Sequence, residues 1–135
     1  MKKFNVWRPE KSELQRFEDD RGIIADIFYK ENINHVAILS SKKNSVRGNH
    51  YHKATTQHTM IIRGVMQYWY KSLEEDAKVS SITLFEGDII SSPPNQIHAL
   101  LALEDYECLV FTEGVRGGED YEKDTFRVLE SIIPE

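Results

Sequence analysis

The chain has one cysteine, no long apolar run and no signal-peptide pattern. Cys108 is the one cysteine among 135 residues, so no intrachain disulfide forms and no cysteine cluster offers a zinc site. No apolar run approaches the roughly 18 residues that span a bilayer. The basic start at Lys2 and Lys3 is not followed by the apolar run of a signal peptide. We therefore expect a cytoplasmic protein without a membrane segment.

A net positive charge is also missing. Lys and Arg number 17 against 22 Asp and Glu, which gives a formal net charge of −5. Dedicated nucleic-acid binders are usually basic, so we expect no nucleic-acid partner. The length suits one domain, and no linker, repeat or low-complexity segment divides the chain. We predict a single domain over residues 1–135.

Short runs rich in β-branched and aromatic residues alternate with turn signals along the chain. The runs cover residues 23–29, 35–40, 59–62, 65–71, 79–84, 88–91, 98–103 and 107–112. Only 10–17 and 74–78 look helical. This pattern predicts an all-β sandwich or barrel with short terminal helical segments.

The run 65–71 shows a clear alternation. Met66, Tyr68 and Tyr70 share one face of the predicted strand, and Val65, Gln67 and Trp69 share the other. Such a strand suits a sheet whose inner face lines a cavity. Aromatic packing in a plain sandwich core explains the pattern equally well, and both interpretations stay open here.

The triplet His50-Tyr51-His52 is the most informative short motif. Residues two apart in a strand project to the same side, with Cα atoms roughly 6.5–7 Å apart. Two imidazoles placed in this way can converge on one metal ion or one substrate. A pair of surface histidines without a function is the alternative.

The spacing around this triplet resembles the two-part signature of the cupin superfamily. The positions that carry the resemblance are His50, His52, Gln57, Gly64, Gly87, Pro93 and His98. Asn44, Gln57, Asn95 and Ala102 stand where the signature has Gly, Glu, Gly and Asn. The resemblance implies a small antiparallel jelly-roll barrel with a site in its mouth.

A narrower resemblance is carried by residues 46–53, which read VRGNHYHK and are followed by Gln57. This stretch looks like that of the dTDP-sugar 3,4-ketoisomerases. Asp20-Arg21-Gly22 matches an element shared with nucleotide-sugar 3,5-epimerases, and residues 120–127 look more like cupin sugar-modifying proteins of capsule biosynthesis, some of which bind zinc. The resemblance implies a nucleotide-sugar isomerase or epimerase of surface-polysaccharide biosynthesis, most simply a 3,4-ketoisomerase acting on a dTDP-4-keto-6-deoxyhexose.

Such chemistry needs a group that removes a proton next to a carbonyl. Histidine suits this role because its pKa lies near working pH. The resemblance makes His50 the candidate base and His52 the second acid or base. The resulting enediolate needs positive charge or hydrogen-bond donors, which Arg47, Lys53 and Gln57 can supply.

The substrate would carry a diphosphate, and an acidic protein must bind it with local cations. We expect Arg47, Lys53 and Arg63 to do so, because arginine in particular matches phosphate geometry. Tyr68 is a candidate for stacking on the base or acting as an acid, and His98 is placed with the substrate-binding residues.

A metal site is the alternative interpretation of the histidines. His50, His52 and His98 offer three imidazoles, and Gln57 offers a fourth ligand. A neutral amide is a weaker ligand than the carboxylate it replaces, so we favour a metal-free site without a cofactor over a divalent metal such as zinc. A third hypothesis is that the domain is a non-catalytic sugar-binding module. His35 and His58 are expected on the surface.

The resemblance also implies a homodimer. The amphipathic outer face of the sheet and the aromatic residues Phe4 and Trp7 near the N-terminus suit strand addition between two subunits.

Overall fold

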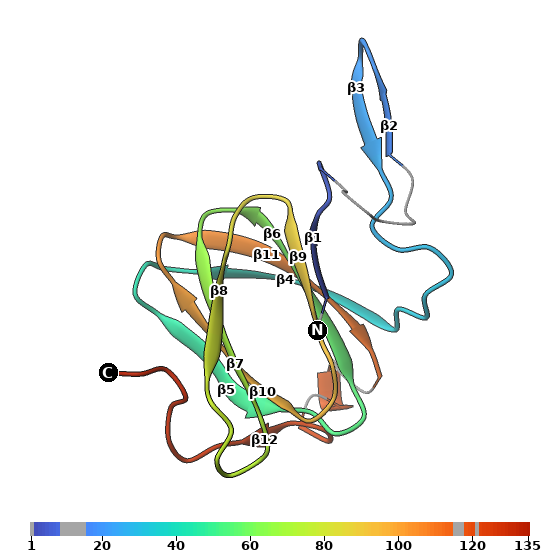
Figure 1. The fold of residues 1–135 in the computed structure, drawn as a ribbon. Coiled ribbons are helices and arrows are strands. Elements are labelled where there is room, and N and C mark those ends of the chain that lie inside the picture. Colours follow the sequence, from blue (N-terminus) through green and yellow to red (C-terminus); the bar gives the residue numbers. More distant parts are fainter. Residues whose placement is uncertain (1, 9–15, 115–117, 121) are drawn as a thin grey trace.

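A computed structural model describes residues 2–8, 16–114, 118–120 and 122–135. Its main body is a barrel of two five-stranded antiparallel sheets that face each other (Figure 1). The first sheet has the strand order β1 (Lys2–Asn5), β9 (Asp88–Ser92), β6 (Thr56–Arg63), β11 (Tyr106–Glu113) and β4 (His35–Ser41). The second has the order β12 (Phe126–Arg127), β5 (Val46–Tyr51), β10 (Gln96–Ala102), β7 (Met66–Ser72) and β8 (Ser80–Leu84).

The predicted all-β class and jelly-roll barrel are confirmed. Every pairing between neighbouring strands is antiparallel. Most expected runs form strands, and the alternation in 65–71 holds: Met66 and Tyr68 are buried inside the barrel. The N-terminal strand β1 pairs with β9 of the same chain.

The helical expectations are wrong where the structure describes them. Residues 10–15 lie outside the described part of the chain, but Arg16 and Phe17 begin β2 (Arg16–Asp19), which forms a two-stranded hairpin with β3 (Gly22–Ala25). Residues 74–78 form turns, with the Ala77 amide donating to the Glu74 carbonyl at 3.1 Å. Within the described residues the helical structure is one 3₁₀ turn, η1 (Gly118–Asp120). No helix in that part of the chain is long and apolar enough to cross a bilayer.

One end of the barrel is filled with apolar side chains, and we call it the packed end. Its buried residues come from both sheets and are Ile61, Met66, Tyr68, Leu84, Ile90, Leu100, Ala102, Tyr106, Cys108 and Val110. They occupy alternate positions on their strands, as expected when one face of each strand is buried. This cluster supplies the burial of apolar surface that stabilises the domain.

Toward the other end of the barrel, which we call the polar end, the inward-facing residues of the same strands are polar instead of apolar. Strand register aligns one row across the first sheet, made by Ser92, Gln57, Thr112 and His35. A second row crosses the second sheet and is made by Tyr70, His98 and His50. Polar side chains therefore meet where the strands of both sheets approach the β5–β6 turn.

The hairpin of β2 and β3 projects away from the barrel (Figure 1). Its turn is formed by Asp20 and Arg21, and the Asp19 carboxylate accepts hydrogen bonds from the backbone amide and the guanidinium of Arg21. Residues 19–22 therefore form a tight turn between two strands and do not follow a helix at residues 16–17.

Candidate active site in the polar end of the barrel

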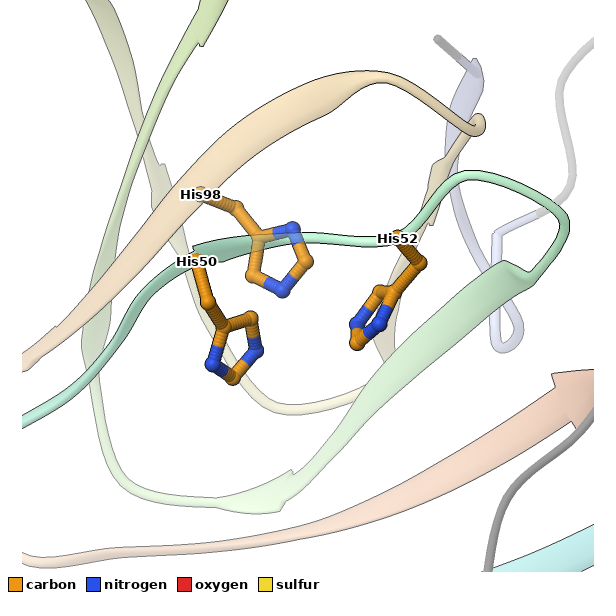
Figure 2. A group of neighbouring side chains, drawn as sticks. All are labelled: His50, His52 and His98. Atoms are coloured by element: carbon orange, nitrogen blue, oxygen red, sulfur yellow. The ribbon is translucent and has the colours of Figure 1, made fainter. Parts of the chain in front are cut away.

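His50, His52 and His98 form one cluster inside the barrel, which we call the histidine cluster (Figure 2). Each ring offers one nitrogen, and these nitrogens lie within 4.8 Å of one another. The ring centroids are 4.8 Å apart for His50 and His98, 5.0 Å for His50 and His52, and 5.4 Å for His52 and His98. His52 and His98 are buried, and His50 is partly exposed.

Strand register brings His50 and His98 together although 48 positions separate them. The two residues face each other directly across β5 and β10, so their side chains lie on the same face of the sheet. A bulge sits next to this pair, because His98 aligns with His50 but Ala99 aligns with Gly48. The extra residue, Asn49, lets Arg47 and His50 share the inner face although they are three residues apart.

The bulge requires an unusual backbone. Gly48 has φ +92° and Asn49 has φ +57°. A Cβ atom on Gly48 would stand 2.7 Å from the His98 carbonyl oxygen, so a side chain does not fit there. Asparagine is among the residues that tolerate the left-handed region best, which explains its place at 49.

His52 lies just beyond the end of β5 and is held from two sides. Its carbonyl accepts a hydrogen bond of 2.6 Å from the Asn95 amide. Its Nδ1 lies 2.7 Å from the Asp124 carbonyl oxygen. A carbonyl only accepts, so Nδ1 carries the proton of this contact, and in the neutral ring Nε2 keeps its lone pair.

Asp124 anchors the chain that follows the barrel onto the β5–β6 turn. Its carboxylate accepts from the Lys53 amide at 2.8 Å, the Ala54 amide at 2.9 Å and the Thr55 hydroxyl at 2.7 Å. Burial acts to raise the pKa of Asp124, but these hydrogen bonds and the nearby His52 outweigh it and hold the pKa below its ordinary value.

A second acidic residue lies near the cluster. Glu122 makes two hydrogen bonds with Arg127, at 2.6 and 2.8 Å. The pKa of Glu122 is lowered by this hydrogen bonding first, and then by the charges of Arg127 and His50. The structure places Asp124 and Glu122 beside the histidines.

Gln57 and Tyr68 also reach the inside of the barrel. Gln57 is 3% exposed and belongs to the polar row of the first sheet. Tyr68 stacks on His98 with a centroid distance of 6.1 Å, and its hydroxyl hydrogen-bonds Ser92. Burial raises the pKa of Tyr68 well above its ordinary value, against the opposing effect of the Ser92 contact, so this phenol stays protonated.

The three cations predicted to bind a diphosphate are not gathered at the histidine cluster. The Arg47 guanidinium donates to Ser41 Oγ at 2.7 Å and to the Ser40 carbonyl at 2.8 Å. Arg63 pairs with Glu107 at 2.7 Å. Both arginines line a hollow of about 770 Å³ toward the packed end, whose described lining residues include no histidine.

Lys53 lies on the outside of the β5–β6 turn. Its ammonium group stands 4.3 Å from the centroid of the Phe126 ring, a cation–π contact. The Phe126 ring in turn stacks on Tyr51, 5.4 Å away. In this structure the lysine side chain therefore fastens the segment after Asp124 to β5.

The two histidines expected on the surface are placed differently. His58 does lie on the face opposite Gln57, but it is buried: its Nδ1 is 2.7 Å from Ser91 Oγ, its Nε2 is 3.1 Å from Glu113, and Phe28 covers it edge-on at 4.9 Å. His35 is partly buried and takes an inward position opposite Thr112. Strand alternation predicts that His58 faces away from Gln57, but it does not predict that Phe28 covers His58 on that face.

Residues 17–125 match the family model described as the polysaccharide biosynthesis C-terminal domain. The chain belongs to this family. The matched residues include most of the barrel described above, with the histidine cluster and Asp124. A search of curated proteins finds no significant match.

Solved structures share the fold of this family member. A dTDP-4-dehydrorhamnose 3,5-epimerase from Sulfolobus tokodaii aligns with a TM-score of 0.73 and 20% identity, over 89% of this chain and 76% of that one. The sugar 3,4-ketoisomerase QdtA from Thermoanaerobacterium thermosaccharolyticum, in complex with TDP, aligns at 0.69 and 19%, over 86% and 85%. These likenesses confirm the fold expected from the sequence resemblance.

A third similar structure is a larger protein. The capsular polysaccharide assembling protein CapF from Staphylococcus aureus aligns with a TM-score of 0.61 and 18% identity, over 87% of this chain. The present chain spans about a third of CapF, with 33% of that chain covered.

Proposed function

We propose that this protein is an enzyme that modifies a nucleotide-linked sugar for polysaccharide biosynthesis by histidine-mediated proton transfer. The observation that carries the proposal is the convergence of three imidazoles inside the barrel, with a buried glutamine, Gln57, rather than a carboxylate in the inward row of the facing sheet. The family match and the kinds of protein that share the fold support the substrate class.

The reaction we favour is 3,4-ketoisomerisation of a dTDP-4-keto-6-deoxyhexose. His50 removes the proton from C3, next to the C4 carbonyl, and the C4 oxygen of the resulting enediolate takes up a proton to give the enediol. A proton is then delivered to C4, while the proton of the C3 hydroxyl passes to solvent or to His52 as the C3 carbonyl forms. No atom is gained or lost overall, so histidines alone can exchange the protons. Tyr68 and Gln57 are hydrogen-bond donors for the enediolate oxygen.

The position of each histidine suits its proposed role. His50 is the most exposed of the three, so it is the one that a sugar entering the barrel reaches first. His52 is held in one tautomer by the Asp124 carbonyl, which leaves Nε2 to accept a proton inside the barrel. Lys53, Arg47 and Arg63 remain candidates for the diphosphate, and binding there requires the nucleotide to reach beyond the histidine cluster.

The test is to incubate purified protein with dTDP-4-keto-6-deoxyglucose in deuterated water and follow the sugar protons by NMR. We expect deuterium at C3 of the recovered substrate and at C4 of a new 3-keto isomer. Deuterium at C3 or C5 with inverted configuration, and no 3-keto product, would indicate an epimerase instead. Binding without exchange, across several nucleotide-sugars, would leave only a non-catalytic sugar-binding module.

A divalent metal site is the second candidate, favoured by the close approach of the three ring nitrogens. Tetrahedral zinc needs ligand atoms about 3.4 Å apart, so nitrogens as far apart as 4.8 Å would have to draw together by small ring rotations. The contact of His52 Nδ1 with a backbone carbonyl is the usual outer support of a histidine ligand. A bound metal would polarise a sugar carbonyl.

Elemental analysis of protein purified without an affinity tag separates the two candidates. Stoichiometric zinc that disappears in His98→Ala would support the metal site. Full turnover by protein that contains no metal, and that has been treated with a chelator, would remove it.

We also propose that the protein works as a homodimer. Strand β4 is an edge of its sheet and exposes Val36 and Ile38 on its outer face, with 54% and 65% of their surface open. The hairpin exposes Phe17 and Ile24 to a similar extent. Covering both with a second copy would bury apolar surface and pair an open strand edge. Light scattering at micromolar concentration should give twice the mass of the chain, and a monomer would contradict the proposal.

A further inference from the structure

The C-terminal segment lies along the strand that carries His50 and His52. From Asp124 onward it runs antiparallel to β5, and β12 pairs Phe126 with Tyr51 and Arg127 with His50. In Figure 1 this orange-to-red segment lies at the edge of the second sheet, where β12 is the neighbour of β5. The chain that follows the barrel is therefore the outer neighbour of the histidine strand.

Asn49 is the point where the end of this segment is attached. Its backbone carbonyl accepts from the Val128 amide at 2.9 Å. Its side-chain oxygen accepts from the Ile132 amide at 3.0 Å, and its side-chain nitrogen donates to Ser131 Oγ at 3.2 Å. One residue thus binds three positions of the C-terminal segment.

Asn49 is also the extra residue of the β5 bulge. Its left-handed backbone, next to that of Gly48, shifts the register by one position so that His50 faces inward beside His98. A flat strand would turn every side chain beyond the bulge to the opposite face. The contacts of Asn49 with the C-terminal segment therefore act on the same backbone that orients His50.

We propose that Asn49 is a positioning residue for His50, and that it sets the direction of this imidazole by fixing the β5 bulge against residues 128–132. Asn49 itself does not touch the reacting atoms. Its side chain holds the segment on the outside of the sheet, and its left-handed backbone presents His50 on the inside. The link to catalysis rests on the proposed function, whereas the link to His50 geometry does not.

The decisive variant is Asn49→Gly, which keeps the left-handed backbone accessible but removes both side-chain hydrogen bonds. Asn44→Gly is the matched control, because Asn44 also has a positive φ, of 73°, but lies in the turn between β4 and β5. Asn49→Asp is the conservative rescue: its carboxylate can accept from both the Ile132 amide and the Ser131 hydroxyl.

The first readout is long-range ¹H–¹⁵N NMR of the imidazoles, which needs no substrate. We expect Asn49→Gly to shift or broaden the His50 resonances, while the resonances of His35 and His58 stay at their parent positions. Asn44→Gly should leave all five histidines unchanged, and Asn49→Asp should restore the His50 signals.

The second readout is the proton-exchange rate, if the parent protein turns over a nucleotide-sugar. A displacement of His50 by about 1 Å costs up to about 100-fold in kcat, and we expect a loss of about 10-fold or more in Asn49→Gly with KM little changed. A parent protein without turnover would count against the proposed function and leave the NMR comparison as the test of Asn49.

Two results would overturn the inference. One is an unchanged His50 spectrum in folded Asn49→Gly. The other is an equal disturbance of His35, His50 and His58, which would mean general loss of structure. If Asn49→Gly does not fold, Ser131→Ala decides: it removes one contact of the segment, and a His50 signal identical to that of the parent protein would contradict the role of the attachment.

Discussion

The packed end and the polar end of the barrel are built from the same strands but differ in what their inward residues do. β10 contributes Leu100 and Ala102 to the packed end and His98 to the polar end. β6 contributes Ile61 to one and Gln57 to the other. Burying apolar groups stabilises the domain, whereas burying imidazoles and amides does so only when their hydrogen bonds are made. Apolar burial at the packed end therefore offsets the free energy that is lost by burying polar side chains at the polar end.

The largest effect that separates the two ends should come from His50→Ala. Loss of a general base costs about 10²- to 10⁴-fold in rate, and the fold should persist because His50 is only partly buried. Exchange kinetics in deuterated water and circular dichroism measure the two quantities. His58→Gln, on the outer face of β6, is the control; a near-normal rate for His50→Ala would remove His50 from the mechanism.

The converse variant is Leu84→Ala in the packed end, where Leu84 is fully buried. Truncating a buried leucine costs about 2–5 kcal/mol through lost burial and the cavity left behind. Urea unfolding should show this loss, while kcat per folded molecule stays at the parent value. A fall in kcat without a fall in stability would mean that the two ends are not separable.

Asp124→Asn tests the junction between the polar end and the C-terminal segment. Hydrogen bonds to a charged group contribute about 1.5–3 kcal/mol, and the amide keeps only part of the three contacts. Because the folded state lowers the pKa of Asp124, its stabilisation is complete above the unfolded pKa of about 3.9 and is lost as pH falls through the folded value.

Thermal unfolding between pH 7 and pH 2 checks this prediction. The parent protein should lose more stability than Asp124→Asn as the pH drops below about 4, so the two curves should converge in acid. A constant difference across the whole range would show that the charge of Asp124 is not what stabilises the turn.

The smallest effect should come from Lys53→Met. The cation–π contact with Phe126 is exposed, and such contacts contribute about 0.5–1 kcal/mol. A small drop in the unfolding free energy with unchanged nucleotide-sugar affinity is expected if Lys53 only fastens the segment. A clear loss of affinity for the diphosphate would instead restore the binding role predicted from the sequence.

The sequence predicted those parts of the molecule that depend on local alternation and on motif spacing. The strand at β7 shows its two faces directly in the sequence, and the resemblance to the cupin signature implied that His50, His52 and His98 belong to one site. The second strand of the hairpin falls in the expected run 23–29. Its first strand was missed because Arg16 and Phe17 end a segment with a helix-like pattern, and this strand has only four residues.

The remaining errors come from contacts between distant segments. The bulge at Asn49 becomes visible only when β5 is set against β10, since no residue pattern within β5 reveals a one-residue shift. The role of Asp124 was not visible in the sequence, because it depends on where the chain returns after β11. Arg63 was predicted to bind the diphosphate, but it ends β6 away from the histidine cluster.

The projecting hairpin has a consequence for how the molecule withstands proteases. Among the described residues no third strand lies beside β2 and β3. A hairpin of two four-residue strands is marginally stable in water, so it opens readily unless something covers it. Arg21 at the hairpin tip has 84% of its side chain exposed, which makes it the natural first cut for trypsin. If a second copy of the chain covers the hairpin, dilution should uncover it. The rate of cleavage at Arg21 across a dilution series therefore shows whether the hairpin is covered.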